Sequence, residues 1–238
     1  MRDGFVLFGV AHLGAIALAF VMPLALAFAV RRAKNPRPLE RWFRHGLAAL
    51  LIATWVIWLG LLYRRGWYGL GNLLPMHLCD WAAILTIVTL ISPRQRSYEL
   101  AYFWALGGTL QALLTPDLHY GFPDLRFIIF FLFHSGIIAS VLYLTFAAGL
   151  RPVPASLPRV MAWSVVYLAA ALTVNAVFGT NFGYLSAKPP GPSMFDMLAP
   201  WPWYIGQLAL IGLASVFVYY APFYLADSLN RRAPRRNL

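Results

Sequence analysis

The chain has 238 residues, of which 61% are hydrophobic and 11% are charged, and its mean hydropathy is +0.66. Water-soluble globular domains carry about a quarter of their residues as charged side chains. The composition therefore excludes that class and indicates a polytopic membrane protein. The formal net charge is +11, but we do not expect a nucleic-acid partner, because no loop is long enough to form a basic polar domain.

Seven apolar segments follow one another along the chain, and most are long enough to cross about 30 Å of hydrocarbon as a helix. Backbone groups inside a membrane must be bonded within the protein, and the segments lack the alternation of a transmembrane barrel. We therefore predict an all-α bundle of seven transmembrane helices that forms a single domain over residues 1–238. The expected helices cover residues 4–30, 46–63, 73–91, 99–114, 127–150, 160–178 and 201–226.

The first apolar segment has some features of a signal peptide, because Ala25 and Ala27 resemble a cleavage site. Its apolar run is too long for a signal peptide, and Arg31, Arg32 and Lys34 follow it directly, as in a retained membrane anchor. We expect it to remain as the first helix.

The basic residues predict the orientation of the bundle, since loops on the cytoplasmic side of a membrane are enriched in lysine and arginine. An outside amino terminus and a cytoplasmic carboxyl terminus place most of the 19 basic residues inside. Only Arg2, Arg64, Arg65, Arg126 and Lys188 then lie outside. The inside set is Arg31, Arg32, Lys34, Arg37, Arg41, Arg44, Arg94, Arg96, Arg151, Arg159, Arg231, Arg232, Arg235 and Arg236.

Polar side chains within the apolar segments fall at similar depths in this topology. Because a helix rises about 1.5 Å per residue, the depth of each polar residue follows from its distance in the sequence to the end of its segment. Seven polar residues fall in the outer half of the bundle, while the inner half is almost purely apolar. A polar cavity open to the outside would give each group a partner, which a lipid-facing position would not. The residues are His12, His77, Asp80, Gln111, His134, Asn175 and Gln207.

His77 and Asp80 are three residues apart and would share one face of a continuous helix. Asp80 would then orient the imidazole of His77, as a general base or a metal ligand requires. A purely structural hydrogen bond is the alternative. Cys79 points elsewhere on such a helix, and it is either a small buried hydrophobic residue or a thiol that a histidine of another helix approaches.

His134 adds a second imidazole to the predicted cluster. With His12, His77 and Asp80 it would supply enough ligands for zinc, yet the spacing matches no metal motif. We expect neither a metal nor another cofactor. Lys188, in the loop before the last helix, is either a solvated lysine or a cation at the mouth of the cavity that receives a phosphate or carboxylate.

Several motifs lie along most of the chain. They are Leu74 to Asp80, Gly107 to Asp117, Phe133 to Ser135, Asn181 to Leu185 with Lys188 and Pro189, and Pro200 to Tyr204. Together these motifs resemble the bacterial YwaF family of integral membrane proteins. That family is similar to the animal transmembrane protein 164, described as a cysteine-dependent phospholipid acyltransferase. The resemblance implies that His77 matches a histidine after Pro-Cys in the animal protein and that His134 matches its helix 5 histidine.

Met76 departs from the family pattern, because it stands where the animal protein places its cysteine. A thioether cannot attack an acyl carbonyl or form a thioester. Cys79 would have to act in its place from one turn further along the chain.

Two classes of function fit these residues. In the first, the protein is a phospholipid acyltransferase or hydrolase in the cell membrane: His77 or His134 is the base, Asp80 orients it, and amides stabilise an oxyanion. In the second, the cavity binds or moves a small polar solute or ion. Membrane lipids are the expected partners, and assembly of identical chains stays open. The candidate catalytic residues are His77, Cys79, Asp80 and His134; the candidate substrate-binding residues are His12, Gln111, Asn175, Lys188 and Gln207.

Overall fold

The computed structural model describes residues 4–191 and 193–232, and over these residues the chain is helical with no named strand. Arg2, Arg235 and Arg236 of the predicted charge pattern lie outside the described residues. The α-helices are α1 (Val10–Arg32), α2 (Pro36–Arg65), α3 (Leu70–Leu73), α4 (Leu78–Ile91), α5 (Gln95–Trp104), α6 (Leu110–Leu114), α7 (Leu125–Phe146), α8 (Ser156–Phe178) and α9 (Trp203–Arg232).

Within the described residues, 6 helical stretches are long and apolar enough to span a membrane. They are α1, α2, α3 with α4, α7, α8 and α9. The fourth predicted segment is not among them because it is divided: α5 is followed by a π-helical segment, η1 (Ala105–Thr109), and then by α6. The protein is therefore a polytopic helical membrane protein with six clear spanning helices.

Several helix boundaries differ from the expected ones for local reasons. α1 begins at Val10 instead of residue 4, because Phe8 has a positive φ of 57° that no α-helix allows. α2 begins ten residues earlier than expected, at Pro36, a residue well suited to the first position of a helix. The third segment is interrupted between α3 and α4, where Pro75 cannot donate a helical hydrogen bond.

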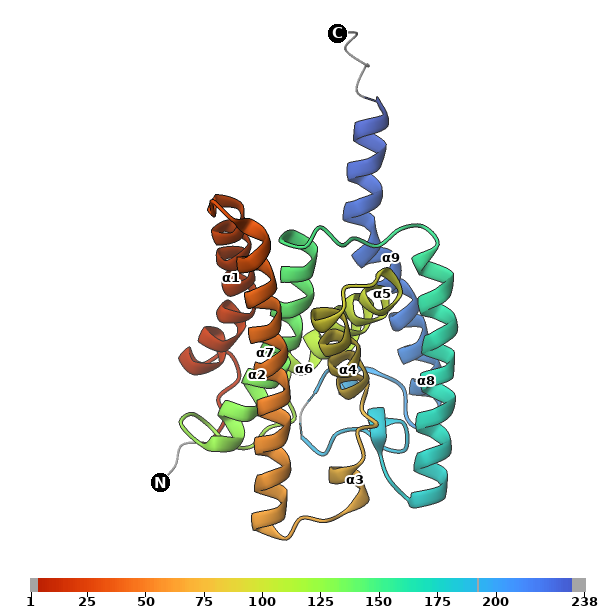
Figure 1. Ribbon diagram of the computed structural model, residues 1–238. Helices are drawn as coiled ribbons and strands as arrows, with labels where there is room; N and C mark the ends of the chain where they lie inside the picture. The colour runs from red at the N-terminus through yellow and green to blue at the C-terminus, as the bar shows by residue number, and fades with distance from the viewer. Residues whose placement is uncertain (1–3, 192, 233–238) are drawn as a thin grey trace, which may run out of the picture.

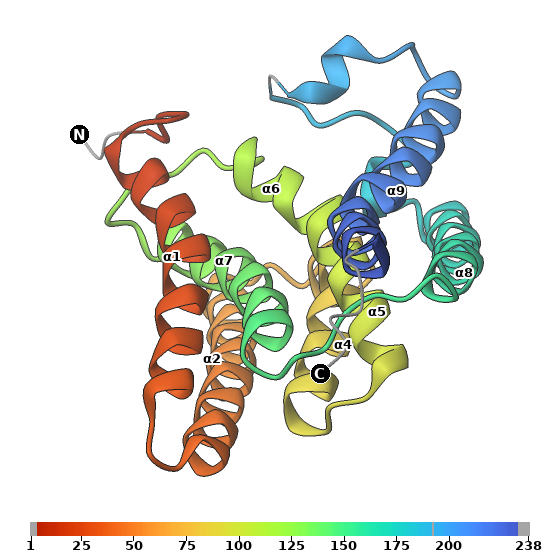
Figure 2. The same ribbon diagram turned by 90° about the horizontal axis from the view of Figure 1, so that it is seen from above.

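The helices form two groups that are joined across the middle (Figures 1 and 2). α1, α2 and α7 lie together on one side, and α4, α5, α8 and α9 lie on the other. The path through α5, η1 and α6 runs obliquely, so it is seen nearly end-on in Figure 1 and lengthwise in Figure 2. α1 begins and α9 ends at opposite ends of the bundle.

α7 is the central helix. It packs against α1, α2, α4, α5 and α6. In the most apolar stretch of α7, 78% of the residues are buried inside the protein, whereas the same share for α9 is 11%. Ser135, Gly136 and Ser140 are small residues on this helix, and a Cβ at Gly136 would already lie 3.0 Å from the side chain of Leu51 on α2. Small residues let membrane helices approach closely, which explains why α7 can pack on so many neighbours.

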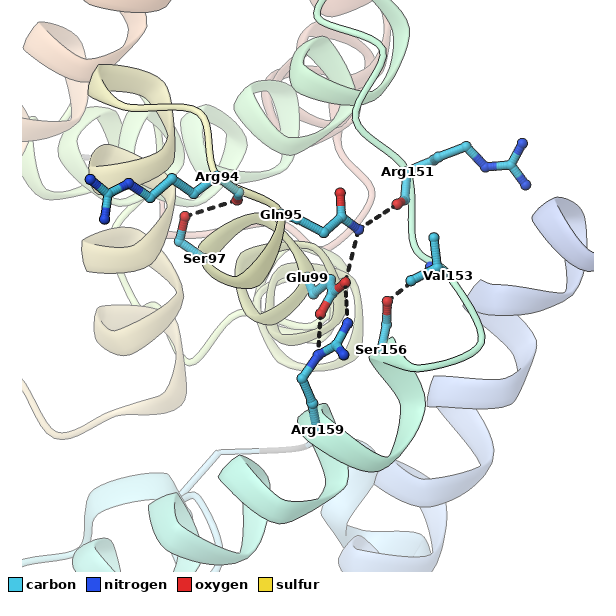
Figure 3. A network of polar contacts seen from close by, with 8 residues as sticks. All are labelled: Arg94, Gln95, Ser97, Glu99, Arg151, Val153, Ser156 and Arg159. Carbon is cyan, nitrogen blue, oxygen red and sulfur yellow. Dashed lines mark hydrogen bonds and ion pairs between the residues drawn. The ribbon is translucent and has the colours of Figure 1, made fainter.

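A buried carboxylate joins the second group of helices at the end opposite the start of α4 (Figure 3). The side chain of Glu99 on α5 is 1% exposed and accepts two hydrogen bonds from the Arg159 guanidinium of α8, at 2.9 and 2.7 Å. The Gln95 amide donates to the same carboxylate at 2.8 Å and to the backbone oxygen of Arg151 at 2.7 Å. Arg151 in turn pairs with Asp227 of α9 at 2.6 Å. The network connects α5, α8 and α9.

We expect Arg159→Ala to lower the midpoint of thermal unfolding, because it leaves the buried Glu99 carboxylate without its cationic partner. Thermal unfolding of the purified protein in detergent measures the change. Arg94→Ala is the matched control, since the Arg94 side chain is exposed and points away from the network. A loss of stability in the control as large as in Arg159→Ala would contradict the assigned role.

Candidate functional site

The break before α4 gives His77 and Asp80 different roles from those expected on a continuous helix. His77 is the residue that precedes α4, with an extended backbone (φ −72°, ψ 152°). The Asp80 carboxylate accepts a hydrogen bond at 2.9 Å from the backbone N–H of His77. Asp80 thus caps the first turn of α4, where a carboxylate also interacts favourably with the helix dipole. It positions the backbone of His77. The imidazole of His77 makes its hydrogen bond with a different segment of the chain.

The imidazole of His77 lies against a short turn that follows α8. Its Nδ1 accepts a hydrogen bond from the backbone N–H of Gly183 at 3.4 Å, and its ring makes an edge contact with Phe182 at 5.2 Å. Gly183 and Tyr184 both have left-handed backbones, with φ of 65° and 54°. A non-glycine residue in this conformation is uncommon and often marks a functional site. The turn is shaped to bring a backbone N–H to His77.

His134 on α7 is 8% exposed. Its Nδ1 lies 2.8 Å from the backbone oxygen of Phe130, and its ring stacks on the Phe130 ring with centroids 4.1 Å apart. A carbonyl oxygen can only accept a hydrogen bond, so Nδ1 of His134 carries the proton. Nε2 of His134 is then left with a free lone pair.

His134 is on α7 and His77 directly precedes α4, and these two helices pack together. The backbone partners of the two histidines select opposite neutral tautomers. Nδ1 of His77 accepts a hydrogen bond, so Nε2 carries its proton, whereas in His134 Nε2 is the unprotonated nitrogen. One ring therefore presents a donor and the other an acceptor.

Cys79 lies on the first turn of α4, half-buried, within electrostatic range of Tyr167 and Tyr184. The Tyr167 hydroxyl donates to the backbone oxygen of Met76 at 3.3 Å. The Tyr184 hydroxyl donates to Asp117 at 2.9 Å. Burial raises the pKa of the Tyr184 hydroxyl, and the neighbouring Asp117 raises this pKa further. The Tyr184 phenol therefore stays protonated.

The segment 179–202 lies beside the start of α4 (Figure 1), and three of the predicted binding residues hold it there. The buried Asn175 amide donates to the Phe182 backbone oxygen at 3.0 Å and accepts from its N–H at 2.8 Å. Lys188 donates to the backbone oxygen of Leu198 at 2.7 Å. Gln207 accepts from the N–H of Ala199 at 2.7 Å. These polar groups position the loop instead of facing an open cavity.

Two other predicted residues lie apart from the histidine pair. His12 is 1% exposed and both of its ring nitrogens are occupied: Nδ1 accepts from the N–H of Phe8 at 2.9 Å and Nε2 donates to the oxygen of Leu113 at 2.8 Å. It joins α1 to α6. Gln111 on α6 is exposed. Among the described residues, no group of three or more histidine, cysteine, aspartate or glutamate side chains could hold a metal ion.

The π-helical segment η1 supports the start of α4 from behind. A Cβ placed on Gly108 would come within 2.7 Å of the Leu78 side chain, so a larger residue at position 108 would require that side chain to move. π-Helical turns are frequent at functional sites. Gly108 thus packs against the start of α4, whereas a Cβ at Gly107 would lie 3.3 Å from the Ser215 hydroxyl of α9.

An apolar groove of about 550 Å³ lies between α1 and α7. Phe131, Ser135 and Gly136 of α7 contribute to its wall, opposite Ala15 and Leu18 of α1. The groove therefore runs along α7, the helix that also carries His134, although His134 itself does not line it.

Comparison with known proteins gives the family. The profile of the TMEM164 family matches residues 7–220, which is most of the chain. The chain belongs to the TMEM164 family. It is also 28% identical over 225 residues to an uncharacterized protein of Treponema pallidum (strain Nichols), with 92% of this chain and 90% of that protein covered. Comparison with solved structures found no match.

In this TMEM164 family member, sequence reasoning missed three residues of the site: Tyr167, Gly183 and Tyr184. Gly183 and Tyr184 lie within a motif that supports the family resemblance, yet nothing in the motif indicates a left-handed turn against His77. Tyr167 lies among apolar residues of α8, and its position beside Met76 and Cys79 depends on how α8 packs.

We expect Asn175→Ala to loosen the 179–202 loop of this TMEM164 family member and expose the site, because Asn175 makes both side-chain hydrogen bonds to the backbone of Phe182. Loss of buried hydrogen bonds of this kind costs about 1–3 kcal/mol. Cys79 is the one cysteine in the sequence, so its rate of labelling by a maleimide reports the opening directly. Labelling should become faster in Asn175→Ala.

Thr173→Ala is the control for this experiment, because Thr173 is on the same helix but its hydroxyl bonds only to the backbone of its own helix. Equal labelling rates in Asn175→Ala and in the unmodified protein would show that the loop does not cover Cys79.

Proposed function

We propose that the protein is a lipid-modifying enzyme of the cell membrane, a phospholipid acyltransferase or hydrolase that acts through His77 and His134. The observation that carries the proposal is the pair of backbone hydrogen bonds at Nδ1, from the Gly183 N–H to His77 and between His134 and the Phe130 oxygen, which favour opposite neutral tautomers of the two rings. Ester attack needs a base for the incoming hydroxyl and a hydrogen-bond donor for the carbonyl oxygen. His134 offers the free lone pair and His77 offers the N–H.

The proposed reaction is direct attack on the ester. Nε2 of His134 takes the proton of an attacking hydroxyl, either water or the free hydroxyl of a lysophospholipid, as its oxygen bonds to the ester carbonyl carbon. Nε2–H of His77 donates a hydrogen bond to the oxyanion, as neutral histidines can. The intermediate then collapses: the bond to the leaving glycerol oxygen breaks, and that oxygen receives the proton from His134.

Cys79 is the alternative nucleophile, and the surroundings argue for the direct route. A thiolate at this position would lie beside the Asp80 carboxylate, whose negative charge opposes it. Met76 cannot replace it, because a thioether has no proton to lose. In the direct route Asp80 fixes the backbone of His77, and the 179–202 loop supplies the N–H of Gly183.

The groove between α1 and α7 supports a lipid as the substrate. Its walls are almost wholly apolar, and it runs along the helix that carries His134. An acyl chain fits such a groove, whereas a small polar solute does not. This is the reason to prefer a lipid ester over the second candidate function, transport or binding of a solute or ion.

His134→Ala and His77→Ala should each lower acyl transfer by about a hundredfold or more, the contribution of a positioned acid or base. The assay incubates purified protein with a radiolabelled phospholipid and an unlabelled lysophospholipid and follows the labelled acyl chain. Cys79→Ala should keep its activity in the direct route. Thr173→Ala is the control, since Thr173 is exposed and its hydroxyl bonds to the backbone of its own helix.

Full activity in both histidine variants would contradict the assigned roles. Uptake of a solute into sealed proteoliposomes with no turnover of lipid would favour the transport function instead. Loss of activity in Cys79→Ala together with a trapped acyl-thioester would replace the direct route by a covalent one.

We also propose that α5, η1 and α6 form a seventh pass of the same transmembrane domain, with the amino terminus outside. The distribution of basic residues supports this orientation. An odd number of passes also agrees with the positions of the start of α1 and the end of α9 at opposite ends of the bundle.

Green fluorescent protein fused after α9 should be fluorescent in bacterial cells, and alkaline phosphatase at the same point should be inactive. Green fluorescent protein becomes fluorescent on the cytoplasmic side of the inner membrane and alkaline phosphatase becomes active on the other side. The two fusions together therefore report on which side the end of α9 lies. An active phosphatase fusion would reverse the proposed topology.

A further inference from the structure

The first three turns of α2 carry two opposed sets of polar residues. Facing inward, Arg44 pairs with Glu40 at 2.6 Å and donates to the backbone oxygen of Leu90. Facing outward, Arg37, Arg41 and His45 are all exposed and follow one another at intervals of four residues. That spacing places the three outward side chains in one row along the helix.

The outward row lines a groove. Arg37, Arg41 and His45, together with Pro38 and Trp42, enclose a hollow of about 350 Å³. The Trp42 side chain is 69% exposed. The hollow therefore combines two guanidinium groups and an imidazole with an apolar wall of tryptophan and proline.

Arg37 and Arg41 have no counter-charge among the residues that the structure describes. In the described part of the chain, neither guanidinium has an ion pair or a hydrogen bond. The carboxylates that the structure describes are already engaged with other groups of the protein. They are Glu40, Asp80, Glu99, Asp117, Asp124, Asp196 and Asp227. An anion for Arg37 and Arg41 has to come from outside this part of the chain.

The position of the groove indicates where that anion comes from. α2 has 30 residues, which gives a length of about 45 Å at 1.5 Å per residue, whereas the hydrocarbon core is about 30 Å thick. The first turns of α2 therefore extend into the headgroup layer. Tryptophan is enriched at this level of a membrane, which agrees with the exposed Trp42.

We propose that this groove, formed by Arg37, Arg41, Trp42 and His45, binds the phosphate of an anionic phospholipid. The planar guanidinium groups match phosphate oxygens with paired hydrogen bonds. Trp42 and Pro38 cover the glycerol and the start of the acyl chains. A zwitterionic lipid brings its own cation and gains less from two unpaired arginines, so the groove selects for net negative charge. The site is independent of the acyl-transfer chemistry.

Native mass spectrometry of the full-length protein tests the site. The protein in detergent receives equal amounts of dioleoyl-phosphatidylglycerol and dioleoyl-phosphatidylcholine, and the ratio of the two retained lipids is measured. The unmodified protein should retain phosphatidylglycerol preferentially. The double variant Arg37→Gln with Arg41→Gln should lower that preference about fivefold or more. Each basic residue near a membrane surface strengthens the binding of anionic lipid by about a factor of five.

The matched control is Arg64→Gln with Arg65→Gln, at the other end of the same helix, where both side chains are also exposed. It removes the same charge and should keep the preference. An equal loss in both double variants, or no loss in Arg37→Gln with Arg41→Gln, would overturn the site. Complete displacement of phosphatidylglycerol by inorganic phosphate at the same concentration would overturn the lipid as its occupant.

Arg37→Lys with Arg41→Lys provides a second variant that keeps the charge and the exposed surface of the helix. It should retain part of the preference, because lysine attracts the phosphate without the paired geometry of a guanidinium. A preference as low as that of the glutamine variant would contradict selection of the lipid by net charge alone, because the lysine variant keeps that charge.

Discussion

Every polar group within the apolar interior of this bundle needs a partner from the protein itself, because hydrocarbon offers none. For the histidines in the bundle, backbone groups supply these hydrogen-bond partners. A carbonyl of α7 binds His134, a carbonyl of α6 binds His12, and an N–H of the 179–202 loop binds His77. These bonds decide which nitrogen of each ring carries the proton, and the chemistry available at each ring follows from that.

The three histidines show how strongly the partner controls the role. His12 uses both nitrogens and serves to join two helices. His77 and His134 each have one nitrogen bound to backbone in the described residues, and the remaining nitrogens differ in protonation. A donor beside an acceptor is a useful arrangement for ester chemistry, whereas two identical tautomers would compete for the same proton. Asp80 contributes through the backbone of His77, which makes it a positioning residue.

The two ends of the bundle differ in what holds them. Near the start of α4, amides and hydroxyls bind backbone groups of the 179–202 loop, with Asn175 as the main contact. At the other end, charged groups are paired in a network around the buried Glu99. Ion pairs and hydrogen bonds to charged groups therefore hold this end together. The loop end depends mainly on hydrogen bonds of amides and hydroxyls to the backbone, with Lys188 as a charged donor to the Leu198 oxygen.

The sequence by itself determined the class of the protein and the approximate positions of its helices, because long apolar runs admit only a few arrangements in a membrane. It also brought His77 and His134 to a similar depth. It did not predict that Pro75 interrupts the third helix, that Asp80 caps α4, or that Gly183 reaches the imidazole of His77. The contact between Gly183 and His77 joins residues 106 positions apart, so no local pattern encodes it. The break at Pro75 and the Asp80 cap are local features of the chain. Only the packing of α8 and its following loop against α4 decided which polar residues form the site and which merely hold it in place.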